Sequence, residues 1–280
     1  MRWHKALCSQ IISPLLGSPN MSQSPSLLVG ILTLNEASKI AQCIESAQFA
    51  DRIVVVDSGS EDATVDIAEQ LGAEVHVYPD WQGFAVQRNR LLAHCHEDYV
   101  FFLDADEVIT PSLQTEIETV VQTQSVGVWE IVWDQVVFGQ PLSRMRETSG
   151  LPRLFEAKNI IGYEGVVHER AILRDASVPV YRFKSRLLHY SRDTIYGSIQ
   201  KLAQYARLGA TKRALLGRKG GVMRGFASAF ASFLKLYIVR RGFLCGGAGF
   251  LYCLFVGLEC FFRYVMIDYD RDHLEARTKR

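Results

Sequence analysis

Two stretches decide the fold of this chain: RIVVVDSGSEDAT, from Arg52 to Thr64, and YVFFLDADE, from Tyr99 to Glu107. Each is an apolar run that ends in a cluster of acidic residues. Unbroken apolar runs are typical of strands that are buried on both faces. Single helical patterns separate these runs, so the sequence predicts an α/β fold with a parallel sheet covered by helices on both faces.

The strand–helix alternation begins at Leu27–Leu34, a predicted strand, and a helix capped by Ser38 is expected next. Thr110 is expected to cap a later helix that has Pro111 at its first position. After about Gly127 the pattern changes to short strand-like runs between polar loops, which predicts an α+β extension. The remaining elements expected before that point are a helix over 62–71 ended by Gly72, a strand over 73–78 and a helix over 84–95.

Acidic residues follow the second and fourth predicted strands, and the ends of parallel strands open onto one edge of a sheet. Asp104 and Asp106 lie two residues apart, and on an extended chain such carboxylates point to the same side. We therefore expect them to share one divalent cation, which would accept phosphate oxygens of a nucleotide substrate. A DxD pattern alone is weak evidence, and its position after a buried strand is what strengthens it.

Seven motifs resemble the inverting glycosyltransferases of family 2, which have a GT-A fold. The later ones resemble the branch that includes lipopolysaccharide-core β-1,4-glucosyltransferases. In chain order they are TLNE (33–36), DSGSEDAT (57–64), Gln87-Arg88-Asn89, FFLDADE (101–107), RLF (153–155), GVVHE (165–169) and LLHYS (187–191). The resemblance implies a nucleotide-sugar-binding half over residues 27–126 and an acceptor-side half over residues 127–193.

The resemblance also implies a donor site. Thr33 and Glu36 would line the nucleoside pocket, where Leu34 stands in place of an aromatic residue that the family often has. The other donor residues would be Asp57, accepting a hydrogen bond from the base; Arg88, near the base and diphosphate; and Asp104 with Asp106, holding the ribose and a Mg or Mn ion.

Inverting transfer needs a base that removes the proton of the acceptor hydroxyl. Glu169 matches the resembled branch best and is the expected base, with Asp106 as the second catalytic residue through its metal. His168 and His189 are alternatives for contact with the metal or the leaving diphosphate. The other groups considered as base are Glu147, Glu156, Glu164, His168 and Asp175.

The composition is that of a folded protein of 280 residues, with 48% hydrophobic and 22% charged residues. Its net charge of +1 predicts no nucleic-acid binding. The six cysteines contain no CxxC pair, so neither a zinc site nor a disulfide scaffold is predicted. Residues 1–26 have a basic start and a short apolar run, which favours a disordered leader or a start at Met21.

The charges are unevenly distributed, because the interval between Asp193 and Glu259 has ten basic residues and no acidic one. Apolar residues alternate with these charges, so residues 194–280 are expected to form a helical region that associates with an anionic membrane surface. Within it, Gly242–Leu258 is a run of 17 residues without a charge. A span needs about 20 residues, which leaves a spanning helix, an interfacial helix and a buried helix as alternatives.

The sequence therefore predicts a metal-dependent inverting glycosyltransferase. It would move a hexose from a nucleotide diphosphate sugar, expected to be UDP-linked, to a membrane-associated glycan or glycolipid such as the lipopolysaccharide core. The expected location is the cytoplasmic face of the cell membrane, peripheral or monotopic, with a single span as the alternative. The other functions considered are a catalytically inactive membrane-bound nucleotide-sugar-binding protein and a sugar nucleotidyltransferase, although TLNEASK (33–39) lacks the Gly-rich loop expected of the latter.

Overall fold

A computed structural model describes residues 24–146, 149–165 and 169–275. His168, Glu147 and most of the predicted leader lie outside the described residues.

The centre of the molecule is one nine-stranded sheet with the strand order β3-β2-β1-β4-β8-β6-β11-β5, in which β7 pairs with β6. The strands β3, β2, β1 and β4 are parallel, as predicted. The later strands extend the same sheet from β4, and β8 lies antiparallel between β4 and β6. The strands are β1 (Leu27–Thr33), β2 (Arg52–Asp57), β3 (Glu74–Val77), β4 (Tyr99–Asp104), β5 (Glu107–Val108), β6 (Val128–Val137), β7 (Gln140–Pro141), β8 (Leu151–Glu156) and β11 (Val180–Arg192), with β9 (Ile160–Glu164) and β10 (Arg170–Leu173) forming a separate hairpin.

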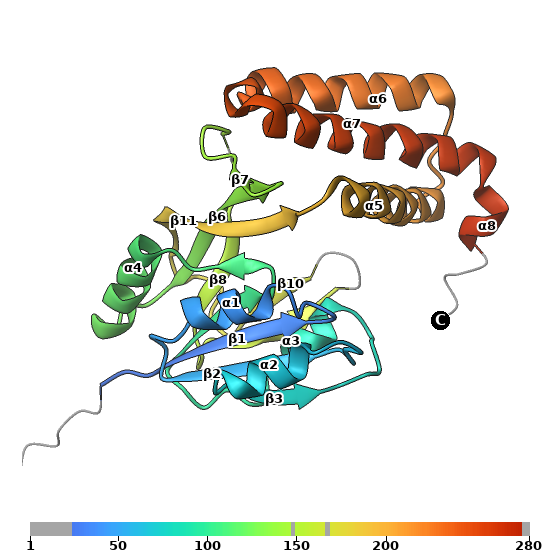
Figure 1. The fold of residues 1–280 in the computed structure, drawn as a ribbon. Helices are drawn as coiled ribbons and strands as arrows, with labels where there is room; N and C mark the ends of the chain where they lie inside the picture. The colour runs from blue at the N-terminus through green and yellow to red at the C-terminus, as the bar shows by residue number, and fades with distance from the viewer. Residues whose placement is uncertain (1–23, 147–148, 166–168, 276–280) are drawn as a thin grey trace, which may run out of the picture.

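Helices cover both faces of the parallel strands, as the unbroken apolar runs predicted (Figure 1). Alternate residues of β1 point to opposite faces: Val29 packs in one core, and Leu28 packs in the other. The first core is closed by α1 (Ile40–Ser46), α2 (Thr64–Gln70) and α4 (Pro111–Gln122), and the second by α3 (Phe84–Leu92) with the β9–β10 hairpin.

The local signals for helix ends were mostly correct. The Thr110 hydroxyl accepts a hydrogen bond from Leu113 N, and Pro111 opens α4. Gly72 follows α2 with a φ of +83°, the left-handed conformation that favours glycine. The predicted Ser38 cap is wrong, because α1 begins at Ile40 with Lys39 at its N-cap position and no side-chain cap.

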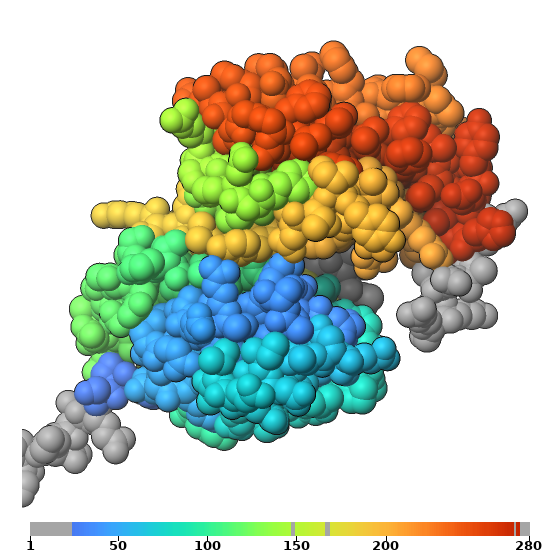
Figure 2. All heavy atoms as spheres, viewed as in Figure 1, coloured from blue at the N-terminus to red at the C-terminus, as the bar shows by residue number. Residues whose placement is uncertain are grey.

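The C-terminal region is helical, as predicted, and forms a layer on one end of the sheet (Figures 1 and 2). Its elements are α5 (Ile195–Leu215), α6 (Val222–Leu234), the π-helical turn η1 (Lys235–Val239), the 3₁₀ helix η2 (Gly242–Cys245), α7 (Gly246–Tyr269) and α8 (Arg271–Glu275). Two segments among the described residues, Val222–Val239 and Gly242–Tyr269, are long and apolar enough to cross a membrane by length and composition. The sequence alone does not predict Val222–Val239 as a spanning segment, because Arg224 and Lys235 interrupt its apolar run.

Candidate active site

The predicted site residues lie at the carboxyl edge of the parallel strands. Thr33 is paired in register with Asp57, and Leu32 of the same strand is paired with Asp104. At the other end of the strand order, His189 of β11 pairs in register with Glu107 of β5. Strand order thus gathers residues that lie more than 150 positions apart in the sequence.

A buried network of charges organises this edge. Nη2 of Arg153, on β8, donates to Asp104 Oδ2 at 2.8 Å and to Glu107 Oε1 at 2.6 Å. Oε2 of Glu107 accepts from the backbone N of Asp104 at 2.9 Å, and Oε1 also accepts from the indole of Trp133 at 2.6 Å. Arg153 is 3% exposed and Glu107 is fully buried, so the two groups meet inside the protein. Nε and Nη1 of Arg153 are buried and have no hydrogen-bond partner among the described residues.

Burial and charge act in opposite directions on the two carboxyls. Burial alone would raise the pKa of Asp104, but the charges of Arg153 and Arg88 outweigh it and hold that pKa well below its usual value. Burial dominates at Glu107 and raises its pKa to about 7, against the opposing charge of Arg153. Asp104 is thus the residue of this pair that is held as a carboxylate.

Asp104 and Asp106 do not lie on an extended chain, because β4 ends at Asp104 and a turn follows. Asp104 faces Arg153 and, through Oδ1 at 3.4 Å, Nη2 of Arg88. Asp106 instead faces His189, with 3.3 Å between Oδ2 and Nε2. Both Asp104 oxygens therefore contact an arginine, whereas Asp106 and His189 form a separate pair.

His189 is held in a polar and aromatic environment. Its ring lies 4.7 Å from that of Trp133, and the backbone N of Tyr190 donates to Asp106 O at 2.8 Å. Burial lowers the pKa of His189, but the hydrogen bond and charge of Asp106 outweigh it and raise the pKa above the ordinary value. Nδ1 of His189 is buried and has no hydrogen-bond partner within the described structure.

Arg88, on α3, connects the strand edge to the β9–β10 hairpin. Its guanidinium lies over the rings of Phe102 and Tyr163, at 5.4 and 5.5 Å from their centroids. Nε of Arg88 is 3.6 Å from Oε1 of Glu169, the predicted base. Glu169 is thereby brought to the same edge as Asp104.

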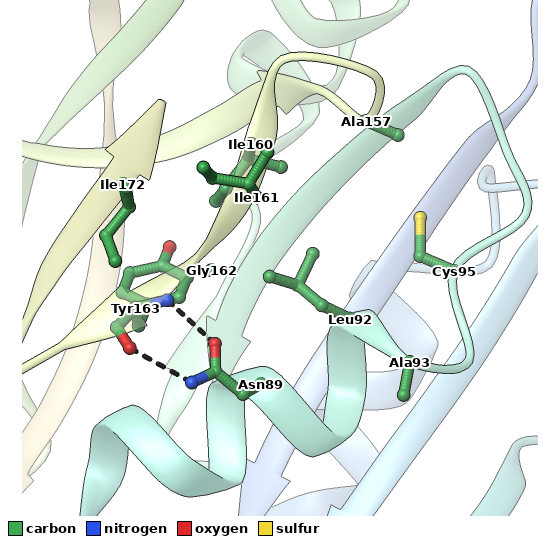
Figure 3. Close-up of a pocket in the computed structure, with 10 residues that line it drawn as sticks. All are labelled: Asn89, Leu92, Ala93, Cys95, Ala157, Ile160, Ile161, Gly162, Tyr163 and Ile172. Carbon is green, nitrogen blue, oxygen red and sulfur yellow. Dashed lines mark hydrogen bonds between the residues drawn. The ribbon is translucent and has the colours of Figure 1, made fainter. Parts of the chain in front are cut away.

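The next residue of α3, Asn89, fixes the helix to β9. Its amide donates to Tyr163 O at 3.0 Å and accepts from Tyr163 N at 2.7 Å (Figure 3). A cavity of about 450 Å³ lies beside this contact, with largely apolar lining residues that include Leu92, Cys95 and Ile160. Arg88 and Asp104 are not among the lining residues, so this cavity is distinct from the strand-edge site.

Asp57 lies at the edge but is not solvent-facing. It is fully buried, and its carboxylate accepts from Gly59 N at 2.8 Å, from Ser60 N at 2.7 Å and from the Ser60 hydroxyl at 2.5 Å. Its position therefore shapes the turn after β2. The hydroxyl of Thr33 is also buried, and it has no partner in the described part of the chain.

Glu36 follows β1 and is half-buried beside a cation. Lys39 Nζ is 3.2 Å from Glu36 Oε2 and 2.8 Å from Asp193 Oδ2, so it ties the β1 loop to the end of β11. Burial raises the pKa of Glu36, and the charge of Lys39 opposes that rise.

The model of the family described as Glycosyl transferase family 2 matches residues 28–167, which is half of the chain. The chain belongs to this family. An uncharacterized glycosyltransferase of Rickettsia typhi is 30% identical over 246 residues, covering 83% of each chain. The lipopolysaccharide core biosynthesis glycosyltransferase LpsC of Rhizobium meliloti is 27% identical over 254 residues, covering 88% of this chain and 93% of LpsC.

Among solved structures, this glycosyltransferase resembles glucosyl-3-phosphoglycerate synthase from Mycobacterium tuberculosis, in complex with Mn²⁺, UDP and glucosyl-3-phosphoglycerate. The identity is 25% and the TM-score is 0.35, over 39% of this chain and 44% of the mycobacterial chain. This overlap is too partial to describe the whole molecule.

The sequence motifs predict no site role for Arg153, Glu107 or Lys39 of this glycosyltransferase. Arg153 carries a signal, because it is a charged residue at the start of the apolar run RLF in a strand-forming stretch. A charge in such a run indicates a buried partner, although the sequence does not say which acid it meets.

Replacing Arg153 by Met is expected to lower the free energy of unfolding by about 3–5 kcal/mol, because Asp104 and Glu107 would lose their buried counter-charge. Adding Glu107→Gln should recover part of the loss. Arg170→Met is the matched control: Arg170 pairs with Glu164 on the surface, where solvent screens the charges and such pairs contribute little to stability. Urea denaturation measures all three. Equal costs for Arg153→Met and Arg170→Met would contradict the role of the buried network.

Proposed function

We propose that this glycosyltransferase is a metal-dependent inverting enzyme that moves a hexose from a UDP-linked donor to a hydroxyl of a membrane-associated glycan or glycolipid, such as the lipopolysaccharide core. The observation that carries the proposal is the strand edge where Asp104, Asp106, Arg88, Glu169 and His189 meet. The relative LpsC is named as a glycosyltransferase of lipopolysaccharide core biosynthesis, and this supports a glycolipid as the acceptor.

The donor would lie across the ends of β1, β2 and β4. Thr33 and Glu36 would contact the nucleoside, and the buried Thr33 hydroxyl has its hydrogen-bonding capacity unused in the described structure. Asp57 would act in the base pocket while it holds the turn after β2. Arg88 would offset diphosphate charge, and Asp104, held ionised by two arginines, would accept hydrogen bonds from the ribose.

The divalent metal fits Asp106 and His189 better than the Asp104–Asp106 pair. Asp106 offers a carboxylate oxygen, the ligand that Mn²⁺ and Mg²⁺ prefer, next to an imidazole nitrogen, which suits Mn²⁺ better than Mg²⁺. Both oxygens of Asp104 already face arginines. When bound there, the ion would supply the positive charge that stabilises the departing diphosphate.

Glu169 is the proposed base. It must accept the proton of the acceptor hydroxyl as that hydroxyl attacks the anomeric carbon. Its contact with Arg88 orients the carboxylate at the edge, and Asn89 fixes α3 against β9, the strand that precedes Glu169 in the sequence. The acceptor would therefore approach from the side of the β9–β10 hairpin.

The α6–α7 hairpin is the proposed membrane-binding surface, on the cytoplasmic leaflet. One face of α6 exposes Met223, Phe226 and Phe230, which are 79%, 58% and 66% exposed. Basic residues 218, 219, 224 and 235 flank this face and would attract anionic lipid headgroups.

The packing of α7 favours a hairpin that lies in the membrane interface over one that spans. Its residues Ala248 and Cys253 pack against Val137 and Leu142 of the sheet region. Glu259 of α7 also forms a buried ion pair with Arg192 of β11. A spanning α7 would have to break both contacts, whereas an interfacial α6 breaks neither.

For the metal, Asp106→Asn and His189→Asn are each expected to lower kcat/KM by about 100-fold or more, because metal stabilisation of the leaving group is worth several kcal/mol. EDTA should have the same effect, and added Mn²⁺ should reverse it. A radiolabelled UDP-sugar transfer or hydrolysis assay provides the measurement, and His273→Ala, on the surface of α8, is the control. Full activity in EDTA would exclude the metal.

For the base, Glu169→Gln keeps the shape of the side chain but cannot accept a proton. We expect kcat to fall about 10²–10⁴-fold, with the calorimetric Kd of UDP nearly unchanged. Glu69→Gln, on the exposed surface of α2, is the control. A kcat within about threefold of the parent would move the role to another carboxylate on the acceptor side, with Glu164 the next to test.

For the membrane, the double change Phe226→Asp with Phe230→Asp should weaken sedimentation with phosphatidylglycerol vesicles at least about tenfold, because two apolar side chains leave the interface. Trp81→Asp with Phe84→Asp is a matched control, since these aromatic residues are 50% and 51% exposed outside the hairpin. High salt should release part of the parent protein. An equal loss of vesicle binding in the two double variants would contradict a binding surface on α6.

A further inference from the structure

We infer that Glu74, His76 and His94 form a second metal site, for a borderline divalent cation of the Zn²⁺ type. This cluster lies at the outer edge strand of the sheet, away from the proposed catalytic edge. One potential ligand atom from each of the three residues lies within 4.8 Å of the other two. The inference is independent of the proposed transfer reaction.

The fold brings the three residues together from two elements. Glu74 and His76 are two residues apart on β3, so their side chains point to the same face of the strand. Nε2 of His76 lies 2.6 Å from Oε1 of Glu74. His94 follows the end of α3, and its ring stacks on that of His76 with centroids 3.6 Å apart and planes within 10°.

Neighbouring side chains already hold two of the proposed ligands. The Tyr78 hydroxyl lies 2.9 Å from His94 Nε2, which leaves Nδ1 of that ring for a metal. Arg52 donates from Nε and Nη2 to Oε2 of Glu74, at 3.0 and 2.7 Å, so Oε1 remains the oxygen that contacts His76. Outer partners of this kind fix the orientation of metal ligands.

Arg52 also links the two sides of the cluster. Its Nη1 donates to the carbonyl oxygen of His94 at 2.7 Å and to Glu97 at 3.3 Å. The same guanidinium thus positions the carboxylate of Glu74 and the backbone of His94. This shared contact holds the cluster, in which Glu74 is exposed and the two histidines are half-buried.

The ligand chemistry selects the class of ion. Two imidazoles and one carboxylate form a set that binds Zn²⁺, with a fourth position left for water. The carboxylate of Glu74 is paired with the guanidinium of Arg52, with 2.7 Å between Oε2 and Nη2.

The rings of His76 and His94 are stacked with nearly parallel planes, and a metal lies in the plane of each imidazole that binds it, so one ring would have to turn out of the stack to complete the site. Ligands about 2.0–2.1 Å from a tetrahedral ion are about 3.4 Å apart, and the candidate ligand atoms here lie within 4.8 Å of one another. The bound ion would clamp the four-residue edge strand β3 to the end of α3, the helix that carries Arg88. Glu74 lies at the start of β3, one strand length of about 10 Å from the catalytic edge.

The test is Zn²⁺ binding to the full-length protein by calorimetry, with Co²⁺ absorption as a second readout of tetrahedral coordination. His76→Ala and His94→Ala should each remove one high-affinity equivalent of Zn²⁺ and the tetrahedral Co²⁺ bands. Tyr78→Phe should weaken the binding about 10–100-fold, as loss of an outer partner does. His96→Ala, an exposed histidine two residues from His94, should change nothing.

Zn²⁺ can also bind the proposed catalytic pair, so His189→Asn is measured in parallel. It should retain the equivalent that His76→Ala loses. Thermal unfolding adds a third readout, because Zn²⁺ should raise the Tm of the parent but not that of His76→Ala or His94→Ala. The inference is wrong if the parent binds no Zn²⁺ at micromolar concentration, or if His76→Ala and the parent bind it equally.

Discussion

The strand edge that carries the proposed active site depends on the buried guanidinium of Arg153. A charge that is 3% exposed needs opposite charges beside it, and Arg153 finds them in Asp104 and Glu107. Arg153 lies on β8, which runs antiparallel to β4, so the pairing exists only where the parallel half of the sheet meets its extension. The acidic turn after β4 is held in one orientation by this contact, and that orientation places Asp106 against His189.

The rest of the site is held by rigid elements rather than by the loops alone. Arg88 lies between two aromatic rings and two carboxylates, and Asn89 makes a pair of hydrogen bonds with the backbone of β9. Such fixed dipoles and charges need little reorganisation when charge develops in a transition state. This preorganisation is what the proposed transfer of a sugar from a charged diphosphate requires.

The C-terminal helices are connected to the same site through β11. His189 and Arg192 lie three residues apart on that strand, and Arg192 is bound to Glu259 of α7. Lys39 links Glu36 to Asp193 at the end of β11. A membrane bound by α6 would therefore hold the strand edge in a fixed orientation to the lipid surface, where a lipid-linked acceptor would be presented.

The sequence alone determined the parallel half of the sheet, because apolar runs, helix caps and a glycine at the end of a helix are local signals. Thr110, Pro111 and Gly72 act within a few residues of themselves, and the structure confirms each. The ends of β2 and β4 also identified the edge at which the acidic residues gather, since parallel strands bring their carboxyl ends together.

Only the tertiary structure decided which charges meet. Arg153 and Asp104 are 49 residues apart, and His189 and Asp106 are further apart still, so strand order rather than any local pattern pairs them. The turn after Asp104 separates two carboxylates that an extended chain would have aligned, and Asp57 is buried because its own turn folds over it. Local sequence determines backbone conformation over a few residues, whereas the partner of a buried charge is determined by which distant strand lies beside it.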